Sequence, residues 1–373
     1  MRILVAHNVP RARTGGMSRL MAFIHDRIES AGHDVDYLCA DDVPDSWVGW
    51  WGRRIAFPMA VRARAVAAER AGCPYDVVNV HEPIAAPLLL HRRAHSASVV
   101  VTSHGLERRA WELAKEEGRL GREAPGWRTR MTYPPTALWP GEFALRRADH
   151  VFCLNDEDKQ ILVTDFDRQP ASITRVTPGA DPIYATAADG RDYSRATRIM
   201  FAGTWRKNKG IEDLVPAFAT FAERHADVML HVVGAGASPE FVRAQFPEQL
   251  HSRIDCHTPG DEVGMAQAFA AADIFLLPSL FEGTPLTLIQ AMLSGLPIVT
   301  TPTCGMKDVI TDGCTGLFVP IRSSSSIVRA LERLKTERAL RECLGRAART
   351  QSITNYSWER SAEPVLRAYE GLR

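Results

Sequence analysis

Glu282 lies in a loop between an apolar segment, 272–278, and a helical pattern that begins near Leu286. Gln290 lies in that pattern eight residues after Glu282, so the two polar side chains can contact two ends of one extended ligand. Free N–H groups at a helix start attract anions, and they favour a phosphate by about 0.3–1 kcal/mol. This spacing predicts a diphosphate site. The alternative is an ordinary strand–helix–strand unit with a solvated glutamate.

Basic and glycine residues in the same half of the chain suit the same ligand. Lys209, near the end of the segment GTWRKNKG, can meet a diphosphate as a compact point charge, and Arg206 can offer a guanidinium. A solvated basic loop is the alternative. Gly234 and Gly236 follow the apolar run HVV, which is a weak signal for backbone close to a nucleotide.

Polar residues also follow two apolar segments of the other half. His81 and Glu82 follow VVNV, and His104 follows SVVVT, with Gly105 allowing close approach of a ligand. The carboxyl ends of parallel strands form the ligand edge of an open α/β sheet, so we expect these residues there. For His104 the alternative is a histidine satisfied by local hydrogen bonds.

The elements that must position these residues occur in two similar series. The chain opens with RILVA, a loop containing Gly15 and Gly16, an amphipathic helix and a second apolar strand. The series restarts with RIMFA at 198–202. In the second series, Pro285 suits the first turn of a helix over 286–294, and IVTT predicts the next strand. Both halves are therefore predicted to be α/β with Rossmann-like sheets.

The length of 373 residues also favours two domains of about 180 residues each. The segment 182–195 is rich in Ala, Asp and Gly and is predicted to be the linker. We expect an N-terminal domain over 1–190 and a C-terminal domain over 191–356, with a last helix over 357–373.

Composition limits the function classes. The formal net charge of +1 offers no global field for nucleic acid. The seven cysteines form no C-x-x-C pair and the chain has no H-E-x-x-H motif, so we expect reduced thiols, no metal and a cytoplasmic protein. Met1 and Arg2 lead directly into a strand, so no signal peptide is expected, and no apolar run approaches the ~20 residues of a membrane span.

Two further segments carry expectations of their own. Aromatic and basic residues gather in SWVGWWGRR, at Trp47, Trp50, Trp51, Arg53 and Arg54. This cluster predicts either a loop packed on its own domain, which we favour, or a weak contact with a membrane or a lipid-linked molecule.

Residues 115–140 are rich in Arg, Gly and Pro, which predicts a long loop. Residues 107–109 are expected to face either a bound ligand or solvent.

The segment FEGTPLTLIQAMLSGLPIV, at 281–299, resembles the donor-site signature of the family 4 retaining glycosyltransferases (glycosyltransferase group 1). That signature has two glutamates separated by seven residues, and here the second position is Gln290. In GTWRKNKG, Lys209 matches the family pattern, whereas Thr204 stands where the family has arginine. The motifs occur in family order from Gly15 to Gly316.

The resemblance implies the GT-B fold, in which two Rossmann-like domains face each other across a cleft and the last helix returns to the N-terminal domain. A nucleotide-sugar, such as a UDP- or GDP-sugar, would bind the C-terminal domain, and a sugar, lipid-linked or small-molecule acceptor the N-terminal one. The reaction would be a hexosyl transfer in carbohydrate biosynthesis, retaining and without a metal. A non-catalytic nucleotide-sugar-binding protein and a GT-B sugar-nucleotide epimerase are the alternatives.

The resemblance also assigns residues. The catalytic candidates are His104, Glu282 and Lys209. The donor-binding candidates are Gly15, Gly16, Gly203, Thr204, Arg206, Lys209, Gly234, Gly236, His257, Thr258, Glu282, Gly283, Thr284, Pro285, Leu286, Thr287 and Gln290.

Overall fold

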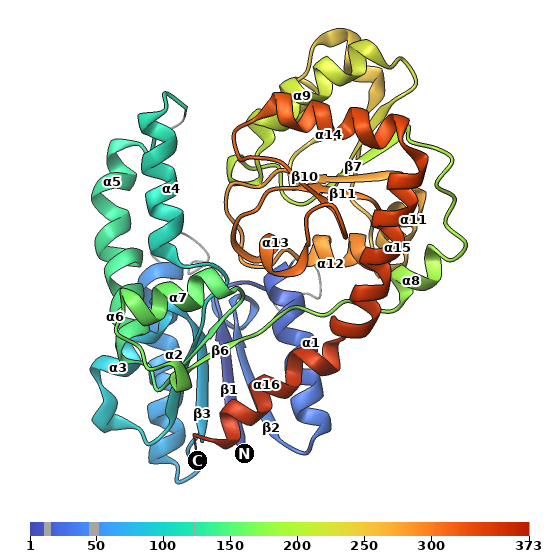
Figure 1. Cartoon of the computed structure of the whole chain (residues 1–373). Coiled ribbons are helices and arrows are strands. Elements are labelled where there is room, and N and C mark those ends of the chain that lie inside the picture. The colour runs from blue at the N-terminus through green and yellow to red at the C-terminus, as the bar shows by residue number, and fades with distance from the viewer. Residues whose placement is uncertain (11–15, 45–51, 123, 373) are drawn as a thin grey trace. The chain divides into compact units, whose positions relative to one another are not determined.

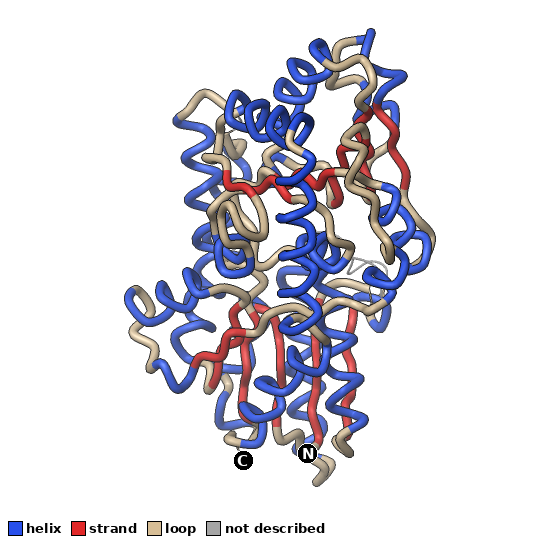
Figure 2. The backbone as a smooth tube through the Cα atoms, turned by 45° about the vertical axis from the view of Figure 1, so that its right-hand side comes forward, coloured by secondary structure: helices blue, strands red, loops and turns tan. Residues whose placement is uncertain are grey.

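The structure is a computed structural model, and it describes residues 1–10, 16–44, 52–122 and 124–372. The chain forms two compact units (Figures 1 and 2). Unit 1 comprises Met1–Thr177 and Glu359–Arg373, and unit 2 comprises Pro178–Trp358. Each unit contains a six-stranded sheet flanked by helices, so the prediction of two Rossmann-like α/β domains is confirmed.

Every strand pair in unit 1 is parallel, and the strands are apolar enough to be buried on both faces. In sheet order they are β2 (Asp34–Cys39), β1 (Arg2–His7), β3 (Val77–His81), β4 (Ser98–Thr102), β5 (His150–Cys153) and β6 (Ile173–Arg175). Because β2 lies on one side of β1 and β3 on the other, the direction of winding reverses between β1 and β3. The fold thus provides a ligand position at the carboxyl ends of these two strands.

Helices cover both faces of this sheet (Figure 1). They are α1 (Gly16–Ser30), α2 (Phe57–Arg70), α3 (Ala86–Leu90), α4 (Glu107–Arg119), α5 (Trp127–Tyr133), α6 (Trp139–Arg147), α7 (Asp156–Thr164) and α16 (Trp358–Glu370). The last helix is held by a buried hydrogen bond of 3.1 Å between Tyr369 Oη and His25 Nε2. Its return to the N-terminal domain was predicted and is confirmed.

Unit 2 repeats the plan with a second parallel sheet. Its strands, in sheet order, are β12 (Leu317–Phe318), β11 (Ile298–Thr300), β10 (Ile274–Leu277), β7 (Arg198–Ala202), β8 (Met229–Val233) and β9 (Ile254–His257). Here the winding reverses between β7 and β10. The residues that follow these two strands are therefore the ones expected to contact a ligand.

The helices of unit 2 enclose one large apolar core. They are α8 (Ile183–Ala187), α9 (Ile211–Arg224), α10 (Pro239–Arg243), α11 (Glu262–Ala271), α12 (Leu286–Leu293), α13 (Cys304–Val309), α14 (Ser324–Thr336) and α15 (Arg338–Asn355). The predicted helix over 286–294 is α12, which begins at Leu286 as expected and ends at Leu293, followed by the C-cap Ser294 and by Gly295, whose φ is +66°.

The division between the units lies after Thr177, whereas the sequence analysis placed it after residue 190. The difference arises because α8, inside the predicted linker, packs into unit 2. Its Tyr184 is fully buried and lies edge-on to Phe269, with ring centroids 5.4 Å apart. This Ala- and Asp-rich segment therefore contains two buried tyrosines, Tyr184 and Tyr193, that fix it to the core of unit 2.

The prediction of a long loop over 115–140 is wrong. Helix α4 continues to Arg119, and after a short turn α5, η6 (Pro134–Leu138) and α6 form one continuous helical segment. Two prolines suggested a loop, but the five-residue turn of η6 accommodates them, with Trp139 N–H donating to the carbonyl of Pro134. The apolar periodicity was hidden because part of this helix's apolar surface faces solvent.

Candidate functional site

The loops after β7 and β10 bring together the two residues predicted for catalysis in unit 2. Lys209 Nζ and Glu282 Oε1 form an ion pair, and the two side chains are only 16% and 12% exposed. Ser279 Oγ also donates to Glu282 Oε1, at 3.1 Å. The pair thus lies at the reversal of winding, where the open sheet has its ligand position.

The backbone fixes these two loops against each other. Gly210 has a φ of +73°, and a Cβ there would lie 1.9 Å from the carbonyl oxygen of Pro278. The carbonyl of Asn208 accepts from Leu280 N–H at 2.7 Å. Only glycine permits this approach, so Gly210 is the residue that allows Lys209 to meet Glu282.

Of the predicted residues near Lys209, Gly203 lies beside the lysine, whereas Thr204 and Arg206 are exposed to solvent. A Cβ on Gly203 would lie 3.7 Å from Lys209 Cε, which places this glycine directly beside the lysine. Thr204 and Arg206 are exposed on either side of the buried Trp205. The alternation leaves the Arg206 guanidinium on the surface of the loop that carries Lys209.

The predicted nucleotide-side residues lie at the carboxyl ends of β8 and β9. Gly234 and Gly236 have φ values of +69° and +64°, and a Cβ on Gly236 would lie 3.7 Å from Thr204 Cγ2. His257 lies at the end of β9, where its carbonyl accepts from Gly234 N–H at 3.1 Å, and Thr258 follows it, exposed. The edge of the sheet therefore continues from Lys209 towards these residues.

The start of α12 completes this edge. Gly283, Thr284 and Pro285 precede the helix, and Leu286 and Thr287 open it, with no side chain capping the first turn. The carbonyl of Gly283 accepts from Gly305 N–H at 2.8 Å, and a Cβ on Gly305 would lie 2.0 Å from Thr284 Oγ1. Close packing of α13 thus holds the loop that supplies a helix N-terminus beside Glu282.

Gln290 has an internal partner that its sequence position does not reveal. It is 2% exposed, and its Nε2 donates to Tyr184 Oη at 2.6 Å. A ribose contact by Gln290 remains a prediction. It would compete with, or add to, this hydrogen bond between α12 and α8.

In unit 1 three histidines follow successive strands of the sheet. His7 ends β1, His81 ends β3 and His104 follows β4, and the ring centroids of His7 and His81 are 6.0 Å apart and those of His81 and His104 4.7 Å apart. Burial lowers the pKa of His104 to about 3, and it lowers the pKa of His81 well below its usual value. The imidazoles of His81 and His104 are therefore neutral at pH 7, and they can exchange hydrogen bonds with hydroxyl groups without a charge.

His104, predicted as catalytic, therefore has two neighbours outside the predicted set. The sequence analysis placed His81 and Glu82 at the ligand edge without giving them a role, and His7 was missed. The available signal was that each histidine follows an apolar strand. Glu82 is buried, and this burial, reinforced by Glu107, raises its pKa to about 8.

Other predictions in unit 1 have mixed outcomes. Gly15 and the tryptophans of the 47–51 cluster lie outside the described residues, and Gly16 begins α1 on an exposed surface. Arg54 does pack on its own unit, with its guanidinium 5.0 Å from the ring centroid of Tyr133. Arg109 pairs with Asp158 at 2.7 Å, which makes it part of the internal structure of unit 1.

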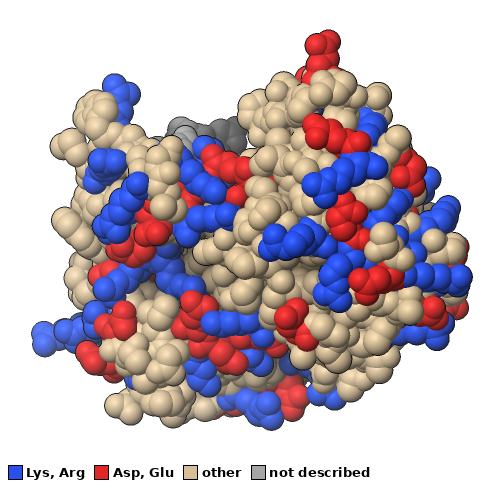
Figure 3. Space-filling view, turned by 45° about the horizontal axis from the view of Figure 1, so that its top comes forward, with Lys and Arg blue, Asp and Glu red and all other residues tan. Residues whose placement is uncertain are grey.

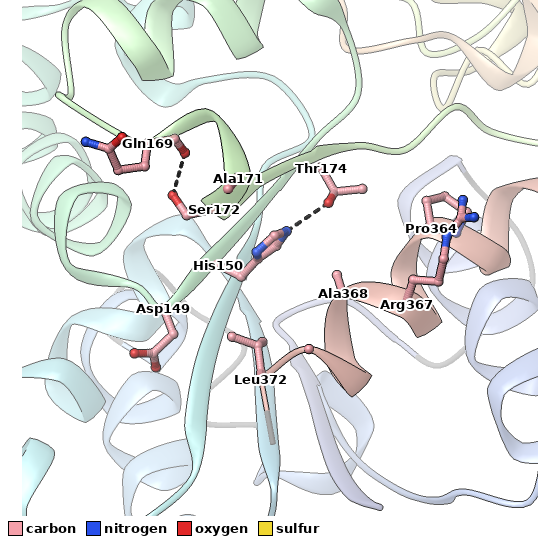
Figure 4. Close-up of a pocket in the computed structure, with 11 residues that line it drawn as sticks. Asp149, His150, Gln169, Ala171, Ser172, Thr174, Pro364, Arg367, Ala368 and Leu372 are labelled. Carbon is pink, nitrogen blue, oxygen red and sulfur yellow. Dashed lines mark hydrogen bonds between the residues drawn. The ribbon is translucent and has the colours of Figure 1, made fainter.

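The structure also contains a hollow of about 590 Å³ in unit 1, between β5, β6 and α16 (Figure 4). His150 lines it and lies 2.9 Å, Nε2 to Oγ1, from Thr174. The hollow lies by the amino-terminal ends of β5 and β6, and no predicted site residue lines it. It is therefore separate from the ligand edge.

Within residues 1–10, 16–44, 52–122 and 124–372, no group of three or more His, Cys, Asp or Glu side chains could hold a metal ion. None of the described helices is both long and apolar enough to cross a bilayer. On the face drawn in Figure 3, acidic and basic residues are interspersed, as the near-zero net charge suggests.

Solved structures of low sequence identity share this fold. Sucrose-phosphate synthase from Thermosynechococcus elongatus is 19% identical, with a TM-score of 0.78 and coverage of 100% of this chain and 99% of that one. WaaG, a glycosyltransferase involved in lipopolysaccharide biosynthesis, is 17% identical, with a TM-score of 0.74 and coverage of 98% of each chain. HepE from Anabaena, solved with UDP and glucose, is 14% identical, with a TM-score of 0.68 and coverage of 99% of each chain.

Curated relatives are more similar in sequence. A D-inositol 3-phosphate glycosyltransferase from Kribbella flavida is 26% identical over 79% of this chain and 71% of its own length. The protein of the same name from Corynebacterium aurimucosum is 30% identical over 60% of this chain, and the match spans 56% of that relative.

Two family models match, and together they span most of the chain. The model described as Glycosyltransferase Family 4 matches residues 14–183, and the model described as Glycosyl transferases group 1 matches residues 196–337. The first covers most of unit 1 and the second most of unit 2, including the segment with Lys209 and Glu282. The chain therefore belongs to the family 4 glycosyltransferases, enzymes with the GT-B fold.

Proposed function

We propose that the protein transfers a hexose from a nucleoside diphosphate sugar to a hydroxyl group, with retention of the anomeric configuration and without a metal. The observation that carries this proposal is the Lys209–Glu282 ion pair at the reversal of winding in unit 2. One partner is a cation suited to a diphosphate, and the other is an acceptor suited to a sugar hydroxyl. When a donor binds, its diphosphate can take the place of Glu282 beside Lys209, and its sugar hydroxyl can take the place of Lys209 beside Glu282.

Cleavage of the sugar–phosphate bond builds negative charge on the departing diphosphate. Lys209 and the uncapped N–H groups at the start of α12 are the groups proposed to stabilise that charge. Arg206, exposed on the same loop, is proposed to supply the guanidinium that the family has at the position of Thr204. Glu282 and Ser279 would orient the sugar. Gly234, Gly236, His257 and Thr258 would border the nucleotide.

The acceptor is proposed to bind unit 1, at the carboxyl edge that carries His7, His81 and His104. Neutral imidazoles suit a hydroxyl-bearing molecule better than an anion, because no charge is available to attract one. His104 is proposed to hydrogen-bond the reacting sugar. Neighbouring folds solved with UDP and with UDP-glucose support a UDP-sugar as the first donor to test.

We also propose that the enzyme works in the cytoplasm, with a weak peripheral contact at the membrane. The tryptophan and arginine cluster in SWVGWWGRR suggested this contact. It is compatible with lipid-linked, sugar and small-molecule acceptors alike.

A donor screen followed by product analysis tests the proposal. Thermal shift with UDP- and GDP-sugars identifies the donor, since a ligand at 100 times its Kd adds about 2.7 kcal/mol of stability. Transfer is then measured as nucleoside diphosphate release with a panel of acceptors, which includes inositol 3-phosphate because the relatives are named for it. NMR of the product is expected to show the donor's anomeric configuration.

The same experiment separates the alternatives. An epimerase would convert the sugar without any acceptor, and a binding protein would be stabilised by a nucleotide-sugar without turnover. An inverted product would contradict the proposed stereochemistry. Activity that requires an added divalent metal after chelation would contradict the metal-independent mechanism.

A further inference from the structure

The continuous helix formed by α5, η6 and α6 has an apolar outer surface. Trp127, Met131, Pro135 and Trp139, here called the outer stripe, recur at every fourth residue and are all exposed. Trp127, Met131 and Trp139 have large apolar side chains, yet they are 68%, 69% and 62% exposed. A soluble helix normally has polar residues on such a face, so the outer stripe indicates a surface that contacts something apolar.

The opposite face of the same helix packs against the rest of unit 1. Tyr133 stacks on Trp111 of α4, with ring centroids 5.0 Å apart, and Arg54 Nη1 donates to Thr136 Oγ1 at 3.0 Å. Ala137 and Leu138 are buried. One face of the helix is thus packed on unit 1, so the outer stripe is the exposed face of a helix that belongs to the folded unit.

The charged residues within the segment that carries the outer stripe have one sign. From 124 to 141 the sequence contains Arg128 and Arg130 and no Asp or Glu. The Arg128 guanidinium lies 5.4 Å from the ring centroid of Trp127, and Arg130 Nε donates to the carbonyl of Pro125 at 2.9 Å. Among the described residues no carboxylate forms an ion pair with Arg128 or Arg130, so neither positive charge is paired within the described part of the chain.

We propose that the outer stripe docks on an anionic phospholipid surface. Exposed tryptophans favour the boundary between headgroups and acyl chains, and an amphipathic helix that lies in this plane buries its apolar face about 5–10 Å deep. Arg128 and Arg130 supply the complement to anionic headgroups. A second copy of this chain is disfavoured as the occupant, because two such faces would bring four arginines together.

The position of the helix connects this surface with the proposed acceptor site. Helix α4 begins five residues after β4, close to His104, and α4 and α5 lie side by side beyond the strands of unit 1 (Figure 1). A membrane-docked outer stripe would therefore present the carboxyl edge of unit 1 to molecules in the headgroup layer. The inference deepens the membrane contact of the proposed function and rests on that function only for the identity of the acceptor.

Vesicle flotation of the full chain tests the proposal without donor or turnover, so its outcome is independent of whether transfer occurs. The probes are vesicles of phosphatidylcholine alone and of phosphatidylcholine with phosphatidylglycerol. Binding is expected only to the anionic vesicles and is expected to fall as salt rises. The Trp127→Ser, Met131→Ser, Trp139→Ser variant is expected to bind at least roughly tenfold more weakly.

Two further variants make the result specific. Arg128→Gln with Arg130→Gln is expected to lower affinity for anionic vesicles by roughly tenfold or more, since each arginine contributes about fivefold. The matched control, Phe241→Ser with Ile353→Ser, removes two side chains of unit 2 that are each 58% exposed and is expected to bind like wild type. Unchanged melting temperatures would show that all variants fold.

Several outcomes would overturn the inference. These are no binding of wild type to anionic vesicles, equal binding of the stripe variant and wild type, and equal loss in the unit 2 control. Light scattering adds a further outcome. A wild-type dimer that the stripe variant converts to a monomer would assign the outer stripe to a second copy of the chain.

Discussion

At Glu282, binding of the sugar can be tested separately from binding of the diphosphate. It accepts from Ser279 and pairs with Lys209, and it is assigned to the sugar rather than to the diphosphate. We expect Glu282→Gln to lower kcat at least roughly tenfold, because a charge-assisted hydrogen bond is worth about 1.5–3 kcal/mol. The affinity for free nucleoside diphosphate should change much less, as calorimetry can measure.

Ser279→Ala provides the control for that prediction. It removes one hydrogen bond to the Glu282 carboxylate but leaves the charge of Glu282 in place, so it should reduce kcat by less than the Glu282 substitution does. An equal loss of diphosphate affinity and of kcat in Glu282→Gln would contradict the assignment to the sugar.

Gln290 and Tyr184 form a residue pair whose separation along the chain explains why the sequence analysis missed it. Their hydrogen bond joins α12 to α8 across 106 residues. We expect Tyr184→Phe to lower the stability of unit 2 by about 0.5–1.5 kcal/mol, the typical contribution of one hydrogen bond, while donor affinity is retained. Urea unfolding and calorimetric titration measure the two effects separately.

Gln290→Ala then distinguishes the ribose prediction from a purely internal role. Loss of donor affinity in Gln290→Ala, beyond that in Tyr184→Phe, would support contact with the ribose. If wild type binds a nucleoside diphosphate and its 2′-deoxy analogue equally, Gln290 does not contact the 2′-hydroxyl.

At the scale of elements, the site depends on close packing between two loops. Gly210→Ala would place a Cβ 1.9 Å from the Pro278 carbonyl at a φ of +73°. We expect this variant to lose both stability and nucleotide affinity, because the loops after β7 and β10 must separate. Gly313→Ala is the matched control, since φ is +71° there but no atom lies within 4 Å.

The control should show only the backbone cost of a left-handed alanine, about 1–2 kcal/mol, with nucleotide affinity unchanged. Calorimetry and thermal unfolding measure the two quantities. If both variants retain nucleotide affinity equally, contact between the two loops is not required for the site.

Elements whose signals are local were predicted well, and elements whose signals are distributed were not. The start of α12 was predictable because Pro285 and Gly295 mark its two ends in the sequence. The segment 115–140 was predicted as a loop because Pro134 and Pro135 end most helices, whereas here a wider turn retains them. Neither this turn nor the burial of Tyr184 has a local signal, because both depend on packing against other elements.

For the whole molecule, buried histidines predict acid sensitivity. His25 Nδ1 lies 2.8 Å from the Met21 carbonyl, and burial lowers the pKa of this histidine to about 4. Because the folded form binds the proton less well, its stability is lost as pH falls below the usual value of about 6.5. We expect this single group to cost about 2 kcal/mol between pH 7 and pH 5.

His25→Gln tests this sign and isolates the group. The variant should lose less stability than wild type between pH 7 and pH 5, as measured by urea unfolding at both values. Glu82 acts in the opposite direction, since its pKa is raised to about 8 and its contribution falls as pH rises. A pH dependence identical in wild type and variant would contradict the assignment to His25.

At this scale the sequence was most informative where motifs and topology agree. Two parallel sheets were predictable from buried apolar strands, and the order of motifs placed Lys209 and Glu282 in the same unit. Their direct pairing was not predictable, because it depends on the order of β7 and β10 in the sheet. The grouping of His7, His81 and His104 was only partly predictable, because it depends on the order of β1, β3 and β4 in the sheet.

The central claim is that Lys209 receives the diphosphate of the donor. Titration calorimetry of wild type, Lys209→Ala and Lys207→Ala with UDP and GDP tests it most directly. Lys207 is the matched control, because it lies on the same loop but pairs with Glu212 at 2.8 Å. We predict that Lys209→Ala weakens binding by about 1.5–3 kcal/mol, or roughly ten- to a hundredfold, and that Lys207→Ala changes it by less than about 0.5 kcal/mol. Equal affinity of the Lys209 variant and wild type for the preferred nucleotide would contradict the account.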